Sequence, residues 1–242
     1  MVTENHKYKI IISCEHGGNQ VPPEYRKLFG GNQSVLQSHR GMDRGALELA
    51  KGLAVKINAP LFASATSRLF VDLNRSLHHR HLFSEFTRHC DPELKKTILE
   101  NYYYPYRTKL KDEIRKILAR GRTVIHLSVH SFTPKLGKEL RRADVGLLYD
   151  PQRQGERDLC RKLQGILKKT SADLSVRRNY PYRGTADGFT TYLRKKYDGS
   201  KYIGIEIEIN QKHANANRAN WNTLRKQIIN AVQLAATQNT LC

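Results

Sequence analysis

Two histidines in this chain stand directly after strand-like hydrophobic runs. His16 follows a run with three consecutive isoleucines, residues 10–12, and two glycines come next. His130 ends a second run, residues 123–129, which is rich in valine, isoleucine and leucine. Runs of this kind are typical of buried strands. Because imidazole is a common ligand of zinc and other divalent metals, both histidines are candidate metal ligands.

The second run contains another histidine, His126, four residues before His130. On a helix this spacing would bring both rings to one metal, but on a strand it separates them by about 13 Å. The β-branched residues of the run favour a strand. We therefore interpret His126 as a hydrogen-bonded interior residue and His130 as the candidate ligand.

A third run, residues 202–211, alternates isoleucines with polar residues. On a strand, the isoleucines would occupy one face and Glu206, Glu208 and Asn210 the other. A carboxylate beside a metal could take a proton from bound water. The alternative is an edge strand with one face in water. The pattern leaves both interpretations open.

Asp43 precedes a predicted amphipathic helix at residues 44–57. It could be the N-cap of that helix, a frequent role for aspartate. It could instead complete a set of two imidazoles and one carboxylate, which with an open fourth position makes a catalytic zinc site. Sequence spacing does not choose between the two.

Arginine and amide side chains gather in residues 64–76, where Arg68, Asn74 and Arg75 offer donors suited to a substrate carboxylate. As an alternative, Arg68 could pair with Asp72 at the surface. Arg183, in a Pro- and Gly-containing loop, supplies another guanidinium. The histidine run at residues 78–81 lies in a predicted loop, and we interpret it as a solvated turn rather than a metal site.

Strand-like and helix-like segments alternate along the chain and predict an α/β fold, with helices on both faces of a mixed, largely parallel sheet. In such sheets polar groups converge beyond the carboxyl ends of strands. We expect one domain over residues 1–242, since no repeat or linker divides it. The predicted strands are 8–13, 61–65, the neighbourhood of Val71, 123–129, 145–149 and 202–209. The predicted helices are 44–57, a stretch from Asp91-Pro92 to Gly121 interrupted at Pro105, 156–169 and 219–236.

The bulk composition is that of a water-soluble protein, with 39% hydrophobic residues and a formal net charge of +20. No apolar run approaches the roughly 18 residues of a membrane span, so we expect no membrane association. The polar amino terminus favours the cytoplasm. Four scattered cysteines predict free thiols, with Cys14 as a small core residue. Because the basic residues are dispersed, we expect a solvated basic surface rather than a nucleic-acid partner.

Several fragments together resemble the N-formylglutamate amidohydrolase family. The similarity extends from Ile11 to Gln211 and rests on these fragments in order: Cys14-Glu-His-Gly-Gly-Asn, His39-Arg-Gly-Met-Asp43-Arg, Ser67-Arg-Leu-Phe-Val-Asp-Leu-Asn-Arg75, His130-Ser-Phe-Thr-Pro, Tyr149-Asp-Pro, Asn179-Tyr-Pro-Tyr-Arg-Gly184 and Glu206-Ile-Glu-Ile-Asn-Gln211. The chain looks like a divergent branch, because Cys-Glu-His-Gly-Gly stands where the family typically has Pro-His-Ser/Ala-Gly. The family is similar in fold to the zinc carboxypeptidases, which implies a phosphorylase/hydrolase-like, three-layer αβα sandwich.

The resemblance also implies a site. One zinc ion would be held by His16, His130 and Asp43, with Glu15 and Asn19 as alternatives to Asp43. Glu208 would be the catalytic base, because the family pattern Glu-x-x-Gln fits Glu208 and Gln211, and Glu206 is the reserve. The substrate carboxylate would be bound by the following residues: Arg68, Asn74, Arg75 and Arg183.

The implied activity is zinc-dependent hydrolysis of the amide bond of an N-acyl amino acid such as N-formyl-L-glutamate, a small-molecule substrate with a carboxylate. Two alternatives remain. One is a carboxypeptidase-like hydrolase of peptide or cell-wall amides. The other is a non-catalytic polyanion-binding protein with the same fold, for which salt-dependent retention of nucleic acid without amide hydrolysis would be diagnostic.

Overall fold

A mixed, six-stranded sheet forms the centre of the computed structural model, which describes residues 7–237. The strand order is β2-β1-β3-β8-β6-β7, and every neighbouring pair is parallel except β6 and β8. The bounds are β1 Tyr8–Cys14, β2 Leu61–Ala63, β3 Thr123–Phe132, β6 Val145–Leu148, β7 Val176–Arg178 and β8 Tyr202–Asn210. A separate antiparallel hairpin joins β4, Lys135–Leu136, to β5, Glu139–Leu140.

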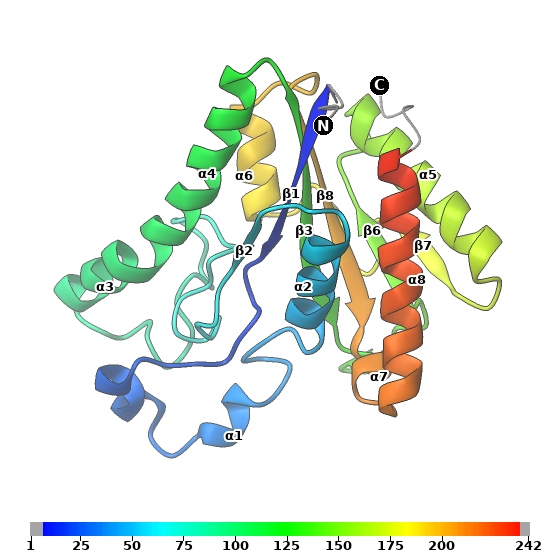
Figure 1. Ribbon diagram of the computed structural model, residues 1–242. Helices are drawn as coiled ribbons and strands as arrows, with labels where there is room; N and C mark the ends of the chain where they lie inside the picture. Colours follow the sequence, from blue (N-terminus) through cyan, green and yellow to red (C-terminus); the bar gives the residue numbers. More distant parts are fainter. Residues whose placement is uncertain (1–6, 238–242) are drawn as a thin grey trace.

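Helices cover both faces of this sheet, so the chain forms three layers (Figure 1). One face packs against α2, Ala46–Lys56, α5, Gln154–Thr170, and α8, Arg218–Thr237. The other packs against α4, Tyr104–Ala119, and α6, Phe189–Lys196. Alternate residues of each strand fill the two cores: Ile12 and Ile205 face α2 and its neighbours, whereas Ile11 and Tyr202 face α4 and α6. The predicted α/β sandwich with a mixed, largely parallel sheet is confirmed.

The remaining helices are short: η1 Pro23–Phe29, α1 Gln33–Leu36, α3 Pro92–Ile98 and α7 Gln211–Ala214. Asp91 caps α3, because its carboxylate accepts a hydrogen bond from the amide of Leu94 at 2.8 Å. The interruption predicted at Pro105 takes the form of a π-helical turn, η2, over Leu99–Tyr103. A wider turn here fits the missing N–H of proline.

One predicted strand was wrong. The residues around Val71 form turns, with the amide of Phe70 bonded to the carbonyl of Ser67 and that of Arg75 to Asp72. Their apolar side chains instead build a second core with Phe29, Leu82 and Tyr103. Burial therefore explains the hydrophobic run without a strand. The prediction lacked β7 and α6, and also the short elements η1, α1, α7, β4 and β5.

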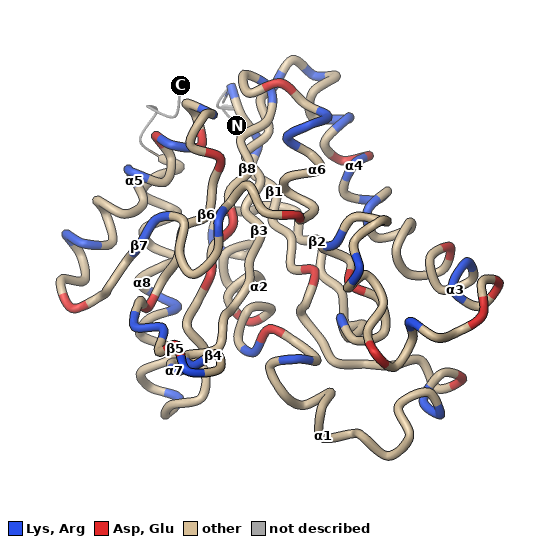
Figure 2. Tube along the Cα trace, turned by 180° about the vertical axis from the view of Figure 1, so that it is seen from behind, with Lys and Arg blue, Asp and Glu red and all other residues tan. Residues whose placement is uncertain are grey.

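The alternative of a wet edge strand is excluded for β8, because it lies between β3 and β6 and is buried along its whole length. Within the described residues, no helix has the length and apolarity needed to cross a membrane. Cys14, Cys90 and Cys160 are free thiols, and Cys242 lies outside the described residues. Lysine and arginine are distributed over helices and loops on both sides of the sheet (Figure 2).

Candidate functional site

The candidate site lies at the carboxyl ends of three neighbouring parallel strands, β1, β3 and β8. Pleating sends alternate residues to one face, so His126, Ser128 and His130 of β3 share the face toward α4 and α6. In the parallel register, Glu206 of β8 stands opposite Ser128 and Glu208 opposite His130. The sheet itself therefore sets the two glutamates beside His130.

The chain after β1 is turned by close backbone packing. A Cβ atom on Gly18 would stand 2.3 Å from the carbonyl oxygen of Ala65, so only glycine fits against the segment that follows β2. The amide of Gln20 bonds to that same carbonyl at 2.9 Å. This packing explains why a hydrophobic strand ends on glycines, and it holds His16 at the strand end.

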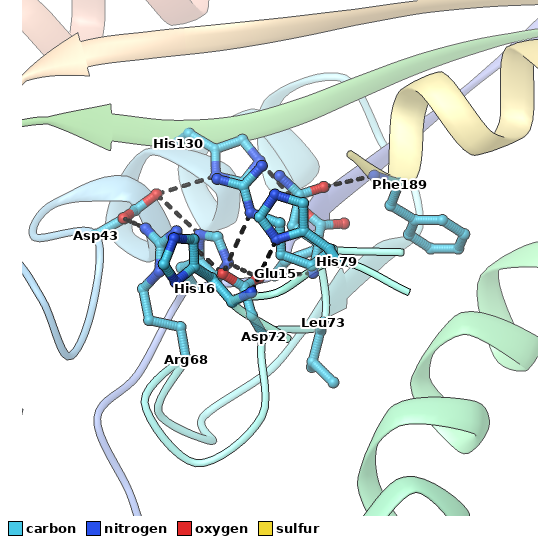
Figure 3. A network of polar contacts seen from close by, with 12 residues as sticks. Glu15, His16, Asp43, Arg68, Asp72, Leu73, His79, His130 and Phe189 are labelled. Atoms are coloured by element: carbon cyan, nitrogen blue, oxygen red, sulfur yellow. Dashed lines mark hydrogen bonds and ion pairs between the residues drawn. The ribbon is translucent and has the colours of Figure 1, made fainter. Parts of the chain in front are cut away.

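His16, Asp43 and His130 form a compact buried group (Figure 3). Oδ2 of Asp43 lies 3.4 Å from Nδ1 of His16 and 3.0 Å from Nδ1 of His130. One ligand atom from each residue lies within 4.8 Å of the other two. Ligands at about 2.0–2.1 Å from a tetrahedral zinc are about 3.3 Å apart, so the two distances from Asp43 suit such an ion. The carboxylate of Asp43 does not cap α2, whose N-cap is Gly45.

Each histidine has a carboxylate on its other ring nitrogen. Nε2 of His16 lies 2.7 Å from Oδ1 of Asp72, and Nε2 of His130 lies 3.3 Å from Oε2 of Glu15. A carboxylate in this position fixes the tautomer and orientation of a metal-ligating imidazole. Glu15 therefore backs His130 rather than joining the His16–Asp43–His130 group, and Asn19 lines a different cavity.

The carboxylates and histidines of this group are buried, and their charges stabilise one another. Burial alone would raise the pKa values of Asp43 and Asp72, but nearby cations outweigh it and hold both pKa values below the usual range. His16 and Arg68 act on both carboxylates, His130 on Asp43 and Arg75 on Asp72. Burial would lower the pKa of His130, yet Asp43 and Glu15 raise it well above its usual value. Carboxylates at this depth require a compensating cation, which protons on histidine or a metal ion can supply.

Glu206 and Glu208 both line a cavity of about 170 Å³ together with the His16–Asp43–His130 group. Burial raises the pKa of Glu208 to about 8 and raises the pKa of Glu206 as well. Among the described residues, Oε2 of Glu208 has no hydrogen-bond partner. A buried carboxylate oxygen without a partner is costly, so this atom, beside the His16–Asp43–His130 group, is suited to contact a ligand or substrate.

The four residues predicted to bind a substrate carboxylate all line this cavity. Arg68 is already engaged, at 3.3 Å from Oδ1 of Asp43 and 3.1 Å from Oδ2 of Asp72. Arg68 and Asp72 do form the predicted pair, but not at the surface, because Asp72 is buried against His16.

The other three residues differ in the hydrogen bonds that they make within the protein. Oδ1 of Asn74 accepts a hydrogen bond from the amide of Phe189 at 2.7 Å, at the start of α6. Arg75 donates from Nη1 to the carbonyl of Asp187 at 2.9 Å. Arg183 is exposed at the rim. Arg75 and Arg183 are consequently the guanidinium groups best placed to meet a ligand.

Buried Arg107 was absent from the sequence prediction, although it supports Asn74 and Arg75. Its Nη1 donates to the carbonyls of Leu73 and Arg75 at 3.0 and 3.3 Å. The guanidinium lies 3.9 Å from the ring centroid of Phe189, so aromatic contact stabilises it where a carboxylate is lacking among the described residues. Arg107 has the helical spacing of the buried residues Leu110 and Ile114 of α4, which is the one signal that could have found it, and nothing local identified its partners.

The histidine predictions outside the His16–Asp43–His130 group can also be compared with the structure. His126 is fully buried, and its ring nitrogens lie 2.7 Å from the Tyr202 hydroxyl and 2.8 Å from the Ser13 hydroxyl. Its interpretation as a hydrogen-bonded interior residue is confirmed. Residues 78–81 form turns, and within residues 7–237 the potential metal-binding group is the one at His16, Asp43 and His130.

Comparison with known proteins gives the family. A family model described as N-formylglutamate amidohydrolase matches residues 8–214. The crystal structure of gene product Atu2144 from Agrobacterium tumefaciens is similar at a TM-score of 0.81 and 27% identity, covering 96% of this chain and 92% of that one. The N-formylglutamate amidohydrolase of Ralstonia eutropha JMP134 is similar in fold at a TM-score of 0.70 and 17% identity, covering 96% and 94% of the two chains. No curated protein sequence matches. Because the family model spans most of its length, this chain belongs to the N-formylglutamate amidohydrolase family.

Proposed function

We propose that the protein is a zinc-dependent amidohydrolase that cleaves the amide bond of an N-acyl amino acid such as N-formyl-L-glutamate, releasing formate and glutamate. Membership of the family supports amide hydrolysis as the reaction class. The observation that carries the proposal is the buried His16–Asp43–His130 group in one cavity with Glu208.

His16, Asp43 and His130 fit a single zinc ion. Two imidazoles and a carboxylate are a common ligand set for catalytic zinc, and the carboxylates of Asp72 and Glu15 orient the two rings from behind. Zinc bound there supplies Lewis acidity, which lowers the pKa of water and polarises a carbonyl oxygen. Asp43, with its pKa below the usual range, is available as an anion for this purpose at neutral pH.

Glu208 is the proposed general base. It stands opposite His130 in the β3–β8 register and has a free carboxylate oxygen. It accepts a proton from the attacking water and returns that proton to the departing amine nitrogen as the C–N bond breaks. In the metal-free protein burial raises this pKa to about 8, and the charge of a zinc ion beside Glu208 would lower it toward neutral pH, where a base works best. Glu206 lies on the same strand face and is the alternative base.

Arg75 and Arg183 are proposed to hold the substrate carboxylate, with the amide nitrogen of Asn74 as a further donor. A fork of guanidinium donors recognises a carboxylate in a defined orientation. Arg68 faces the same cavity, but its contacts assign it to orienting Asp43, a proposed ligand, and Asp72, the partner of His16.

The direct test is metal content together with turnover. Purified protein is expected to bind one zinc and to hydrolyse N-formyl-L-glutamate, with activity lost on chelation and restored by zinc. His16→Ala and His130→Ala are each expected to abolish both properties. His39→Ala is the matched control, because His39 is exposed and outside the cavity. Stoichiometric zinc in His130→Ala would contradict the assigned site.

Asp72→Asn is expected to weaken zinc binding by about 10- to 100-fold, the usual effect of removing a carboxylate behind a ligating histidine. Asparagine keeps the shape but offers His16 a neutral partner and releases Arg68 from one carboxylate. Competition with a chromogenic chelator measures the affinity. Asp187→Asn is a useful comparison, because Asp187 lines the cavity without touching either histidine. Equal effects of the two variants would argue against a specific role for Asp72.

A further inference from the structure

A second cavity, which we name the cationic groove, lies between residues 77–88 and the segment formed by α3 and η2. Its volume is about 710 Å³, and its basic lining residues are Arg80, Arg88, Lys95 and Lys96. Glu100 is the carboxylate among the described lining residues. Over residues 7–237, no carboxylate lies at ion-pair distance from any of the four cations. The groove therefore presents net positive charge, with four cations against Glu100 in its lining and Glu85 close enough to Arg88 for their charges to interact.

The floor of the groove is apolar and aromatic. Phe83, Leu99 and Tyr104 contribute to it, and Nζ of Lys95 lies 5.9 Å from the ring centroid of Phe83. A groove that combines apolar surface with a few charged groups is typical of sites for small organic ligands, and 710 Å³ lies within the usual size of about 300–1,000 Å³. The chemistry suits a flexible chain with several carboxylates.

The groove adjoins the proposed catalytic cavity. Arg75 lines the catalytic cavity and Leu77 lines the groove, so the two linings come within about 7 Å along the backbone. His79, in the groove, is close enough to Arg75, Asp187 and Asp72 for their charges to act on it, while burial and Arg75 lower its pKa. The amide of Ser76, between the two cavities, bonds to the Asp187 carboxylate at 3.1 Å.

The catalytic cavity is small by comparison. At about 170 Å³ it holds the reacting part of a substrate but falls below the size that usually encloses a whole organic ligand. A longer substrate must extend beyond it. Because Arg75 is proposed to bind the carboxylate on the amine side of the scissile amide, an extension on that side leads toward Leu77 and the groove.

We propose that the natural substrate is an N-acylated acidic peptide, whose amine-side extension carries carboxylates that bind in the cationic groove. This proposal rests on the proposed function for the chemistry at the scissile bond. It adds a substrate class and a second binding site: the catalytic cavity takes the acylated residue, and the groove takes the acidic extension.

The test compares two substrates of equal length, N-formyl-Glu-Glu-Glu and N-formyl-Glu-Gln-Gln. The quantity measured is the ratio of their kcat/KM values within each protein. The groove variant is Arg88→Gln/Lys95→Gln/Lys96→Gln. The control variant, Lys51→Gln/Lys168→Gln/Lys169→Gln, removes the same charge from exposed positions outside both cavities.

The wild type is expected to favour the acidic peptide by about tenfold, because each exposed charge pair contributes a factor of about two to five. The ratio should fall to about one in the groove variant and stay at the wild-type value in the control variant. The preference should also weaken as salt is raised. A ratio near one in the wild type, or an equal fall in both variants, would overturn the proposal.

Failure of the proposed function can be distinguished from failure of the groove proposal. If the zinc-loaded wild type cleaves neither the peptides nor N-formyl-L-glutamate, the hydrolase assignment is wrong. The fluorescence anisotropy of fluorescein-labelled tri-glutamate then tests whether the groove binds acidic peptides. Binding to the wild type and control variant but not to the groove variant supports the site. Equal binding of tri-glutamate by all three proteins, or by none of them, would rule out the groove as a binding site.

Discussion

Glu208→Gln is expected to lower kcat on N-formyl-L-glutamate by about 10²- to 10⁴-fold, the usual contribution of a general base. Glutamine has almost the same shape and keeps one carbonyl oxygen, but it cannot accept and return the proton. Because Glu208 is outside the His16–Asp43–His130 group, zinc content should remain at the wild-type level. Steady-state kinetics and metal analysis on the same preparation measure both quantities.

Glu206→Gln is the matched comparison, since it changes the same chemical group on the same strand face. Glu206 lies opposite Ser128, two residues farther from the carboxyl end of β8 than Glu208. Its substitution should reduce kcat by less than about tenfold if Glu208 is the base. The reverse order of effects would transfer the role to Glu206, and full activity in both variants would exclude a glutamate base on β8.

Glu208→Gln is also expected to change the stability of the metal-free protein. Burial raises the pKa of Glu208 from 4.5 to about 8, so between these pH values the folded state holds a proton that the unfolded state has released. The free energy of unfolding therefore falls as pH rises through this window, by at most a few kcal/mol. Glu208→Gln removes this contribution, and urea unfolding with a chelator at pH 5.5 and pH 8.5 should show a smaller loss than in the wild type.

The sheet could be predicted because its central strands carry their own local signal. β1, β3 and β8 are apolar and β-branched, and their observed bounds differ from the predicted ones by only a few residues. Val71 misled the prediction because apolar residues in an irregular segment bury as well as those in a strand. α6 was missed because its start is stabilised from a distance, by the side chain of Asn74 on the amide of Phe189.

The convergence of His16 and His130 was predictable for a similar reason, because parallel strands end at one edge of a sheet, whereas Asp43 follows no strand and its role was implied only by the family resemblance. The partner of each histidine was not. Asp72 lies four residues after Arg68, which offered a simple local ion pair, while its contact with His16 spans 56 positions. Glu15 was considered as a ligand because it adjoins His16, yet its carboxylate reaches His130 instead. Side-chain direction at a strand end depends on the next loop, which sequence spacing does not reveal.

A buried ion-pair network links α5 and α6 to β8 and supports the site from outside. Nε of Arg194 lies 3.0 Å from both carboxylate oxygens of Glu156, and Nε of Arg153 lies 3.1 Å from one of them. Nη2 of Arg194 donates to the carbonyl of Gly204 in β8 at 2.7 Å, and Nη1 donates to that of Gly184, next to Arg183. The carboxylate of Glu156 also accepts the amide of Asp150 at 2.9 Å.

Glu156→Met is expected to lower the free energy of unfolding by about 3–5 kcal/mol, because it leaves the buried guanidinium of Arg194 without its carboxylate. The double variant Glu156→Met/Arg194→Met should recover part of this loss, since two apolar side chains leave no unpaired charge. Asp158→Ala, which removes an exposed partner of Arg161 in the same helix, should cost less than about 1 kcal/mol. Urea unfolding of zinc-free protein compares the three. A loss in Glu156→Met no larger than that in Asp158→Ala would mean that water reaches Arg194 and that the network does not hold the Gly184 loop against β8.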